Sequence, residues 1–206
     1  MTYRELQGQL DAWFEHGVAS AGPGVVLCRR GCSACCVGPF DISPADAELV
    51  ARAVDRLEPA TRSRVQLRAM DQVTQYVELA PRWNAPWNVD ALGDHRFDRV
   101  SDTLAGLPCP AVGDDGACLV YDDRPANCRM IGLAMLTPEG GILDNSCPIL
   151  HTSERYASLE PTLFDLEQFE SAADRFDDAA RRGGWVTTTV AGAITTSEKQ
   201  QATSKK

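Results

Sequence analysis

The sequence lacks any long apolar segment. Nowhere in its 206 residues do about 18 consecutive apolar residues occur, the length that a membrane-spanning helix needs. The first twenty residues are interrupted by charged side chains such as Arg4, Asp11 and Glu15, and they contain no unbroken apolar stretch of the kind found in secretory signals. We therefore expect a cytoplasmic protein that does not associate with a membrane.

An excess of positive charge is also missing. The chain has 29 acidic residues against 20 Lys and Arg, and its formal net charge is −9. Because phosphate backbones attract basic surfaces, this balance argues against a non-specific nucleic-acid binder. We expect no nucleic-acid partner, whereas a protein partner with a basic surface is compatible with the charge.

Two common cofactor and redox patterns are absent as well. No Gly-x-Gly motif follows a predicted strand, so the sequence does not indicate a dinucleotide-binding unit. A Cys-x-x-Cys pair is present at Cys32 and Cys35, but the strand and helix that would flank it in a thioredoxin-like protein are not. There is no internal repeat.

What the sequence does contain is clustered cysteine. Hydrophobic residues make up 44% of the chain, so it can bury an ordinary core and does not need metal or disulfides merely to fold. In a reducing compartment, clustered cysteines are more often ligands or catalysts than disulfides. Such crowding of soft sulfur predicts a thiolate-bound metal or an iron–sulfur cluster. The eight cysteines, which form our predicted ligand set, are Cys28, Cys32, Cys35, Cys36, Cys109, Cys118, Cys128 and Cys147.

The first four cysteines lie within nine residues. Spacings of two or three residues let sulfurs converge on one centre, and Gly31 gives the loop room to fold back. Consecutive side chains tend to diverge, however, which makes Cys35 and Cys36 hard to place on one ion. We expect one of these two to reach toward a second centre or toward the downstream cysteines.

The downstream cysteines occupy positions typical of metal-binding turns. Cys109 and Cys118 lie on either side of an Asp-Gly turn in a predicted hairpin. Cys128 falls in the first turn of a short predicted helix, where the helix dipole favours a thiolate. Cys147 is followed four positions later by His151, which is either an added imidazole ligand or an ordinary loop residue.

Four arginines, Arg29, Arg30, Arg124 and Arg129, lie next to cysteines in this acidic chain. Several thiolates on one metal leave a net negative charge, which guanidinium groups would offset. The alternative is that these arginines are simply exposed on loops.

Hydrophobic periodicity predicts a mainly α fold with one or two short β-hairpins around an irregular, cysteine-rich metal-binding centre. A loop at 81–88 carries Trp83 and Trp87, which either pack over the core or form an aromatic surface facing a substrate. We expect one domain over residues 1–186 and a flexible tail over 187–206. The predicted helices cover about 3–16, 43–57, 59–80, 97–104 and 161–181 with a short one from Pro125, and the hairpins lie at 109–121 and around Gly140 and Gly141. Ser43 is the expected N-cap of the second helix, with Asp46 at the acceptor position of a capping box, and Gly183 and Gly184 are expected to stop the last helix.

The order of these motifs resembles a known family. The first cluster is followed by Cys-Pro, by Gly-x-Cys-x-Val-Tyr-x-x-Arg-Pro-x-x-Cys-Arg and by a late Cys-Pro, over about residues 28–150. This pattern resembles the CxxCxxCC (YkgJ-like) cysteine-cluster family, described as zinc- or iron-chelating. One departure is that three residues separate Cys28 from Cys32, where the family's name has two. The matching residues are Cys28, Cys32, Cys35, Cys36, Cys109, Gly116, Cys118, Tyr121, Arg124, Pro125, Cys128, Arg129 and Cys147.

The resemblance leaves three functions open. The first is a metal-binding protein whose centre is structural or is transferred to a protein partner. The second is a metal-dependent enzyme that modifies a protein or small molecule, because a flagellin lysine methylase is similar in its cysteine-rich part; Trp83, Trp87 and Tyr121 would then wall a substrate cleft. The third is a thiol–disulfide oxidoreductase using Cys32 and Cys35. Eight sulfurs with an adjacent pair favour iron, as an iron–sulfur cluster or a multinuclear site, and zinc is the alternative.

Overall fold

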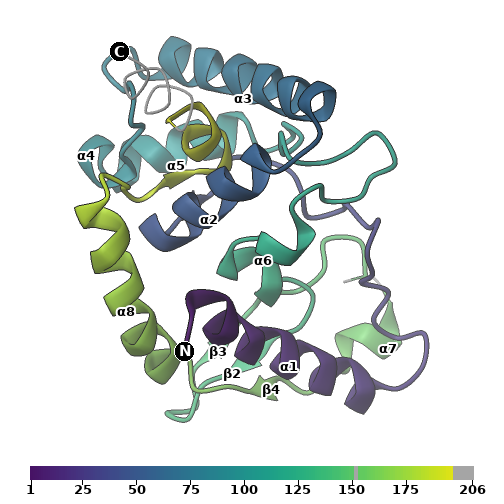
Figure 1. Cartoon of the computed structure of the whole chain (residues 1–206). Coiled ribbons are helices and arrows are strands. Elements are labelled where there is room, and N and C mark those ends of the chain that lie inside the picture. Colours follow the sequence, from purple (N-terminus) through teal and green to yellow (C-terminus); the bar gives the residue numbers. More distant parts are fainter. Residues whose placement is uncertain (151–152, 197–206) are drawn as a thin grey trace.

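The computed structural model describes residues 1–150 and 153–196, and it is mainly helical (Figure 1), as the periodicity predicts. The longer helices are α1 (Tyr3–Ala21), α2 (Pro44–Asp55), α3 (Pro59–Leu79), α5 (Asp94–Thr103) and α8 (Leu166–Arg182). The shorter ones are α4 (Val89–Leu92), α6 (Ala126–Met130), α7 (Glu154–Ala157) and the 3-10 turn η1 (Tyr121–Asp123), and residues 190–196 are also helical. No helix in the described part of the chain is both long enough and apolar enough to span a bilayer.

Two small sheets accompany the helices. Strand β2 (Met135–Leu136) pairs antiparallel with β3 (Ile142–Leu143) and parallel with β4 (Thr162–Leu163). Strand β1 (Asp41–Ile42) pairs antiparallel with β5 (Thr188–Thr189). The hairpin predicted around Gly140 is therefore confirmed. The one predicted at 109–121 is reduced to a single bridge between Val112 and Cys118.

Local capping residues explain where the helices begin. Thr2 and Glu5 form a reciprocal capping box at the start of α1. Ser43 caps α2 by accepting a hydrogen bond from the backbone N–H of Asp46, as predicted. The last long helix starts later than the predicted residue 161, because 162–163 form β4 and Asp165 caps α8. It ends as predicted at Gly183.

The hydrophobic interior consists of two clusters. The α2–α3 core is built around fully buried Val50, Tyr76 and Ile194. The α1 core is built around Leu6 and Met135, beside the three-stranded sheet. Figure 1 shows α6 lying between α2 above and α1 below, with α8 running along one side of both. The short helix α6, which carries Cys128, thus lies between the two cores.

Tyr3 and Phe176 connect the two cores. Each packs against both clusters, and their ring centroids are 5.4 Å apart. Contacts of α8 with both α1 and α2 reinforce this connection.

The prediction of a flexible tail over 187–206 is wrong for residues 188–196. Thr188 and Thr189 pair with β1, and Ala193 and Ile194 are at most 1% exposed. The polar composition that suggested a tail is accommodated because threonine hydroxyls bond to the preceding helical turn. Thr196, for example, donates to the Gly192 carbonyl at 2.8 Å. Residues 197–206 lie outside the described part of the chain.

The loop with the two tryptophans packs into the protein. Trp83 and Trp87 are 4% and 7% exposed, and the Trp83 ring stacks on Tyr76 with centroids 5.1 Å apart. The packing interpretation is therefore confirmed, and an exposed aromatic surface at these residues is wrong. Both tryptophans belong to the α2–α3 core.

Candidate metal centre

The first cysteine cluster forms two successive tight turns. The backbone N–H of Cys32 donates to the Arg29 carbonyl at 3.0 Å, and that of Cys36 donates to the Ser33 carbonyl at 3.0 Å. Gly31 lies in the first turn with φ +92°, a conformation that favours glycine. This folding back gathers four thiols along one short segment.

Backbone pairing attaches this segment to Cys109. The N–H of Cys109 donates to the Cys36 carbonyl at 2.9 Å, and the N–H of Gly38 donates to the Leu107 carbonyl at 2.8 Å. An antiparallel bridge joins Val37 to Pro108 between these bonds. Cysteines that are far apart in the sequence are thus held together by main-chain contacts.

A turn next to this pairing carries Cys118. The N–H of Gly113 donates to the Ala117 carbonyl at 2.7 Å, and Val112 bridges Cys118. Gly116 in the turn has φ +79°, and a β-carbon there would be 3.1 Å from the Gly31 carbonyl oxygen. The turn therefore lies directly against the first cysteine loop.

Cys147 reaches the same region through a buried tyrosine. Its N–H donates to the Tyr156 hydroxyl at 2.7 Å, and this hydroxyl donates to the Gly132 carbonyl at 2.8 Å. The N–H of Gly132 in turn donates to the Asn145 carbonyl at 2.6 Å. Cys147 is 4% exposed, and its thiol lies beside that of Cys28.

The structure brings the predicted ligands around one cavity of about 550 Å³. Much of the remaining wall is apolar, including Phe14, Phe40 and Val50. All eight cysteines are free thiols. Cys147 neighbours Cys28 but does not itself line the cavity. The seven cysteines that line the cavity are Cys28, Cys32, Cys35, Cys36, Cys109, Cys118 and Cys128.

The thiols surround this cavity without meeting at a single point. Within residues 1–150 and 153–196, no three Cys, His, Asp or Glu side chains are arranged to hold a metal ion as they stand. Binding would thus require cysteine side chains to turn inward. His151, the imidazole considered as a ligand, lies outside the described residues.

Burial opposes ionisation of most of these thiols. It raises the pKa of Cys109 and of Cys28 to about 12, and neighbouring thiols add to the effect on Cys28. The pKa of half-buried Cys128 is also raised, first by burial and then by Cys109 and Cys118. Metal binding at these positions must therefore displace protons.

Cys35 and Cys36 behave as an unequal pair. A hydrogen bond from Cys36, assisted by Arg124, lowers the pKa of the exposed Cys35 thiol to about 6. The same hydrogen bond raises the pKa of Cys36. Cys35 is therefore the thiol best prepared to act as a thiolate at neutral pH.

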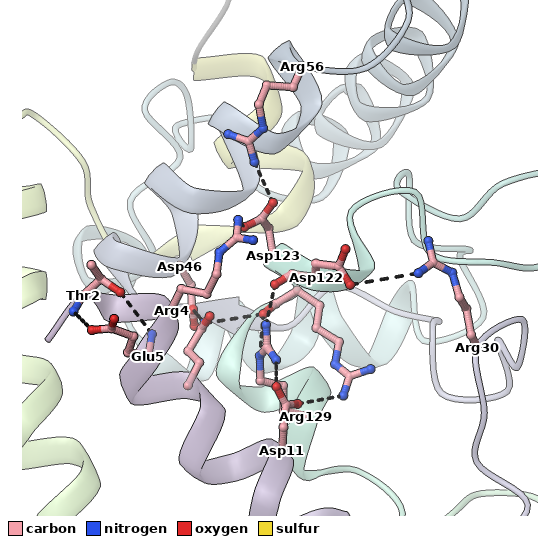
Figure 2. A network of polar contacts seen from close by, with 12 residues as sticks. Thr2, Arg4, Glu5, Asp11, Arg30, Asp46, Arg56, Asp122, Asp123 and Arg129 are labelled. Atoms are coloured by element: carbon pink, nitrogen blue, oxygen red, sulfur yellow. Dashed lines mark hydrogen bonds and ion pairs between the residues drawn. The ribbon is translucent and has the colours of Figure 1, made fainter.

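Two arginines next to the cavity share one carboxylate, as Figure 2 shows for Asp11 and Arg129. Asp11 on α1 forms ion pairs with Arg129, which is 4% exposed, and with Arg124 at 3.2 Å. The Arg124 guanidinium also lies 4.2 Å from the centre of the Tyr121 ring. Two guanidinium groups against one carboxylate leave net positive charge beside the thiols, as expected for Arg124 and Arg129.

Asp46 is a site-supporting residue that the sequence did not reveal. Its carboxylate accepts hydrogen bonds from the Tyr3 hydroxyl at 2.9 Å, from Gln7 at 2.8 Å and from the N–H of Ala126 at 3.1 Å. It thereby joins α1 and α2 to the start of α6, two residues before Cys128. Its position in the sequence predicts a role in capping α2, but the carboxylate is instead turned inward, and Asp46 is 3% exposed.

The donors around the cavity fit an anionic, sulfur-rich centre. The side-chain nitrogen of Asn145 and the Nε of Arg124 are buried, line or adjoin the cavity wall, and have no hydrogen-bond partner among the described residues. Both are N–H donors. Donors of this kind stabilise metal-bound sulfur and tune iron–sulfur centres.

Fold and site together define a helical protein with a thiol-lined cavity suited to chelating a metal. A family model described as "CxxCxxCC: Putative zinc- or iron-chelating domain" matches residues 27–148. Because this match covers more than half of the chain and includes all eight cysteines, the protein belongs to the CxxCxxCC family. No curated protein and no solved structure matches the chain.

Proposed function

We propose that this protein binds iron, as an iron–sulfur cluster or a multinuclear iron site, with zinc as the alternative metal. The proposed ligands are the thiolates of Cys28, Cys32, Cys35, Cys36, Cys109, Cys118, Cys128 and Cys147. The observation that carries the proposal is that seven of these eight cysteines, drawn from four separate stretches of sequence, line one cavity. The eighth, Cys147, adjoins Cys28.

The number of sulfurs supports more than one metal ion. A tetrahedral structural zinc takes four ligands, whereas this cavity of about 550 Å³ is surrounded by nearly twice as many thiols. The N–H donors of Asn145 and Arg124 that have no hydrogen-bond partner within residues 1–150 and 153–196 are further support, because a cluster carries sulfurs that accept hydrogen bonds. When bound, an iron–sulfur cluster would supply one-electron chemistry, and zinc would supply a redox-inert structural or Lewis-acidic centre.

The two other functions gain no specific support from the site. Of the aromatic residues expected to wall a substrate cleft, Trp83 and Trp87 belong to the α2–α3 core and only Tyr121 lines the cysteine cavity. Cys32 and Cys35, the pair expected for an oxidoreductase, are two of seven thiols on the same cavity.

The deciding experiment is anaerobic purification followed by elemental analysis and a visible absorption spectrum. The expected result is iron together with broad sulfur-to-iron charge-transfer absorption. A colourless protein that contains zinc would instead identify zinc as the bound metal. Cys128→Ser and Cys35→Ser should each lower both metal content and stability, with Ser33→Ala on the same loop as the matched control. Unchanged metal content in both cysteine variants would remove these residues from the ligand set. A folded protein free of transition metal would overturn the proposal.

A further inference from the structure

The thiols around the cavity are anchored in different parts of the interior. Cys109 and Cys118 pack against the α2–α3 core. Cys147 is a buried member of the α1 core, and Cys28 packs against that same core. The cavity thus lies where the two cores meet, and each core contributes its own cysteines.

On the side of the α1 core, Cys28 and Cys147 form one local unit. A β-carbon at Gly132 would be 2.8 Å from the Cys28 sulfur, so this sulfur lies directly against the Gly132 backbone. The Tyr156 hydroxyl connects that backbone to the N–H of Cys147. Cys32 completes this group, because its thiol is an electrostatic neighbour of Cys28.

On the side of the α2–α3 core, four other thiols form a second unit. Cys36 and Cys109 are joined by a main-chain hydrogen bond of 2.9 Å. The thiols of Cys109 and Cys118 both act electrostatically on Cys128, and Cys109 and Cys128 both act on Cys36. Neither Cys28 nor Cys147 is among the largest electrostatic influences on Cys36, Cys109 or Cys128, where the thiols involved come instead from within this second group and from Cys35.

We propose that the cavity holds two unequal metal sites, which deepens the function proposed above and depends on it. The first is a closed site of Cys36, Cys109, Cys118 and Cys128. The second is an open site of Cys28, Cys32 and Cys147. Four thiolates complete a tetrahedral coordination shell, whereas three leave one position for another ligand.

Cys35 lies at the boundary between the two sites. It is the one exposed cysteine of the eight, and it acts electrostatically on Cys28 as well as on Cys36, Cys109 and Cys128. We assign it as the thiolate that either bridges the sites or covers the open position. The open site therefore suits a divalent ion, zinc or iron(II), whose free coordination position can be occupied by a thiol ligand from another molecule.

The experiment measures how fast zinc leaves the full-length protein after anaerobic loading with zinc alone. A chromogenic chelator should remove it in two phases of about equal amplitude, since an open site releases its ion faster than a closed one. Cys147→Ser should abolish the fast phase and about half of the bound zinc while leaving the slow phase. Cys118→Ser should remove the slow phase, and Ser33→Ala should change neither. Because Cys147 is buried and this variant risks misfolding, Cys32→Ser on the loop serves as the second test of the open site.

The outcomes separate this inference from the proposed function. The two-site division is supported if zinc leaves the wild type in two phases, if Cys147→Ser and Cys32→Ser remove only the fast phase, and if Cys118→Ser removes only the slow phase. Release in a single phase, or loss of all zinc from folded Cys32→Ser protein, would overturn the division while leaving metal binding intact. A folded wild-type protein that takes up neither zinc nor iron would overturn the proposed function itself.

Discussion

Gly132 lies directly against the sulfur of Cys28, and a β-carbon built at Gly132 would be 2.8 Å from that sulfur. Gly132 also has φ +120°, in the backbone region that residues with a side chain rarely adopt. The position therefore requires glycine on two independent grounds, one steric and one conformational. Two variants can separate them.

Gly132→Ala should lower the free energy of unfolding by about 2–4 kcal/mol, because backbone strain and overpacking act together. Gly140→Ala is the matched control, since Gly140 has φ +86° but no atom within 4 Å of a β-carbon placed there. The control should cost only about 1 kcal/mol. Urea denaturation measures both, and equal losses would show that the contact with Cys28 is unimportant.

Cys35 should be the most reactive thiol of the metal-free protein. Its pKa is lowered to about 6, so it is a thiolate above that pH, whereas the pKa of Cys109 is raised to about 12. Alkylation by iodoacetamide, followed residue by residue by mass spectrometry, should show half-maximal rate at Cys35 near pH 6. Cys36→Ala removes the hydrogen-bond donor and should move this midpoint upward. A Cys35 midpoint near 9 in the wild type would contradict the assigned hydrogen bond.

Asp46 should make stability depend on pH in the mildly acidic range. Burial raises its pKa from 3.8 to about 6, so the folded chain holds the proton more tightly than the unfolded chain. The resulting stabilisation is fully present below pH 3.8 and is lost as the pH rises through about 6. Between these limits it amounts to up to about 3 kcal/mol.

The comparison with Asp46→Asn isolates this effect. Loss of thiolate-bound metal in acid affects both proteins alike, and a changed hydrogen bond to Ala126 adds an offset that does not vary with pH. The difference in free energy of unfolding between wild type and variant should therefore fall from pH 4 to pH 6. A constant difference over this window would mean that burial does not shift Asp46.

Asp11→Asn should leave the guanidinium of Arg129 without its counter-charge. Arg129 is 4% exposed, but Asp11 is 38% exposed, so we expect a loss of about 1–3 kcal/mol, less than for a fully buried pair. Asp178→Asn is the control, because Asp178 pairs with Arg181 at 3.3 Å on the open surface of α8 and should cost less than about 0.5 kcal/mol. Thermal or urea unfolding of the two variants gives the comparison, and equal losses would argue against a role for the buried pair.

Features specified by neighbouring residues could be predicted from the sequence. The Ser43 cap, the end of α8 at Gly183 and the hairpin at Gly140 each depend on a few adjacent residues, and all three are confirmed. The grouping of the first four cysteines follows equally from their spacing. For the distant cysteines, the order of the motifs along the chain indicates a common site.

Features that depend on distant partners were missed. Nothing near Tyr156 indicates that its hydroxyl joins Gly132 to Cys147, and nothing near Asp46 indicates a bond to Ala126, 80 positions away. The strand at 188–189 escaped prediction for the same reason, since polar threonines become strand residues there only by pairing with β1. In each case tertiary contact overrides the local pattern.

The bridge between Val37 and Pro108 has a consequence for metal affinity. By fastening the chain to itself at these two points, it turns the intervening helices into a closed loop whose ends carry Cys36 and Cys109. The entropy cost of closing this loop is then part of the free energy of folding and does not reduce the free energy of metal binding. Cys36 and Cys109 are therefore preorganised before the metal binds, and this raises the metal affinity because binding does not have to bring the two residues together.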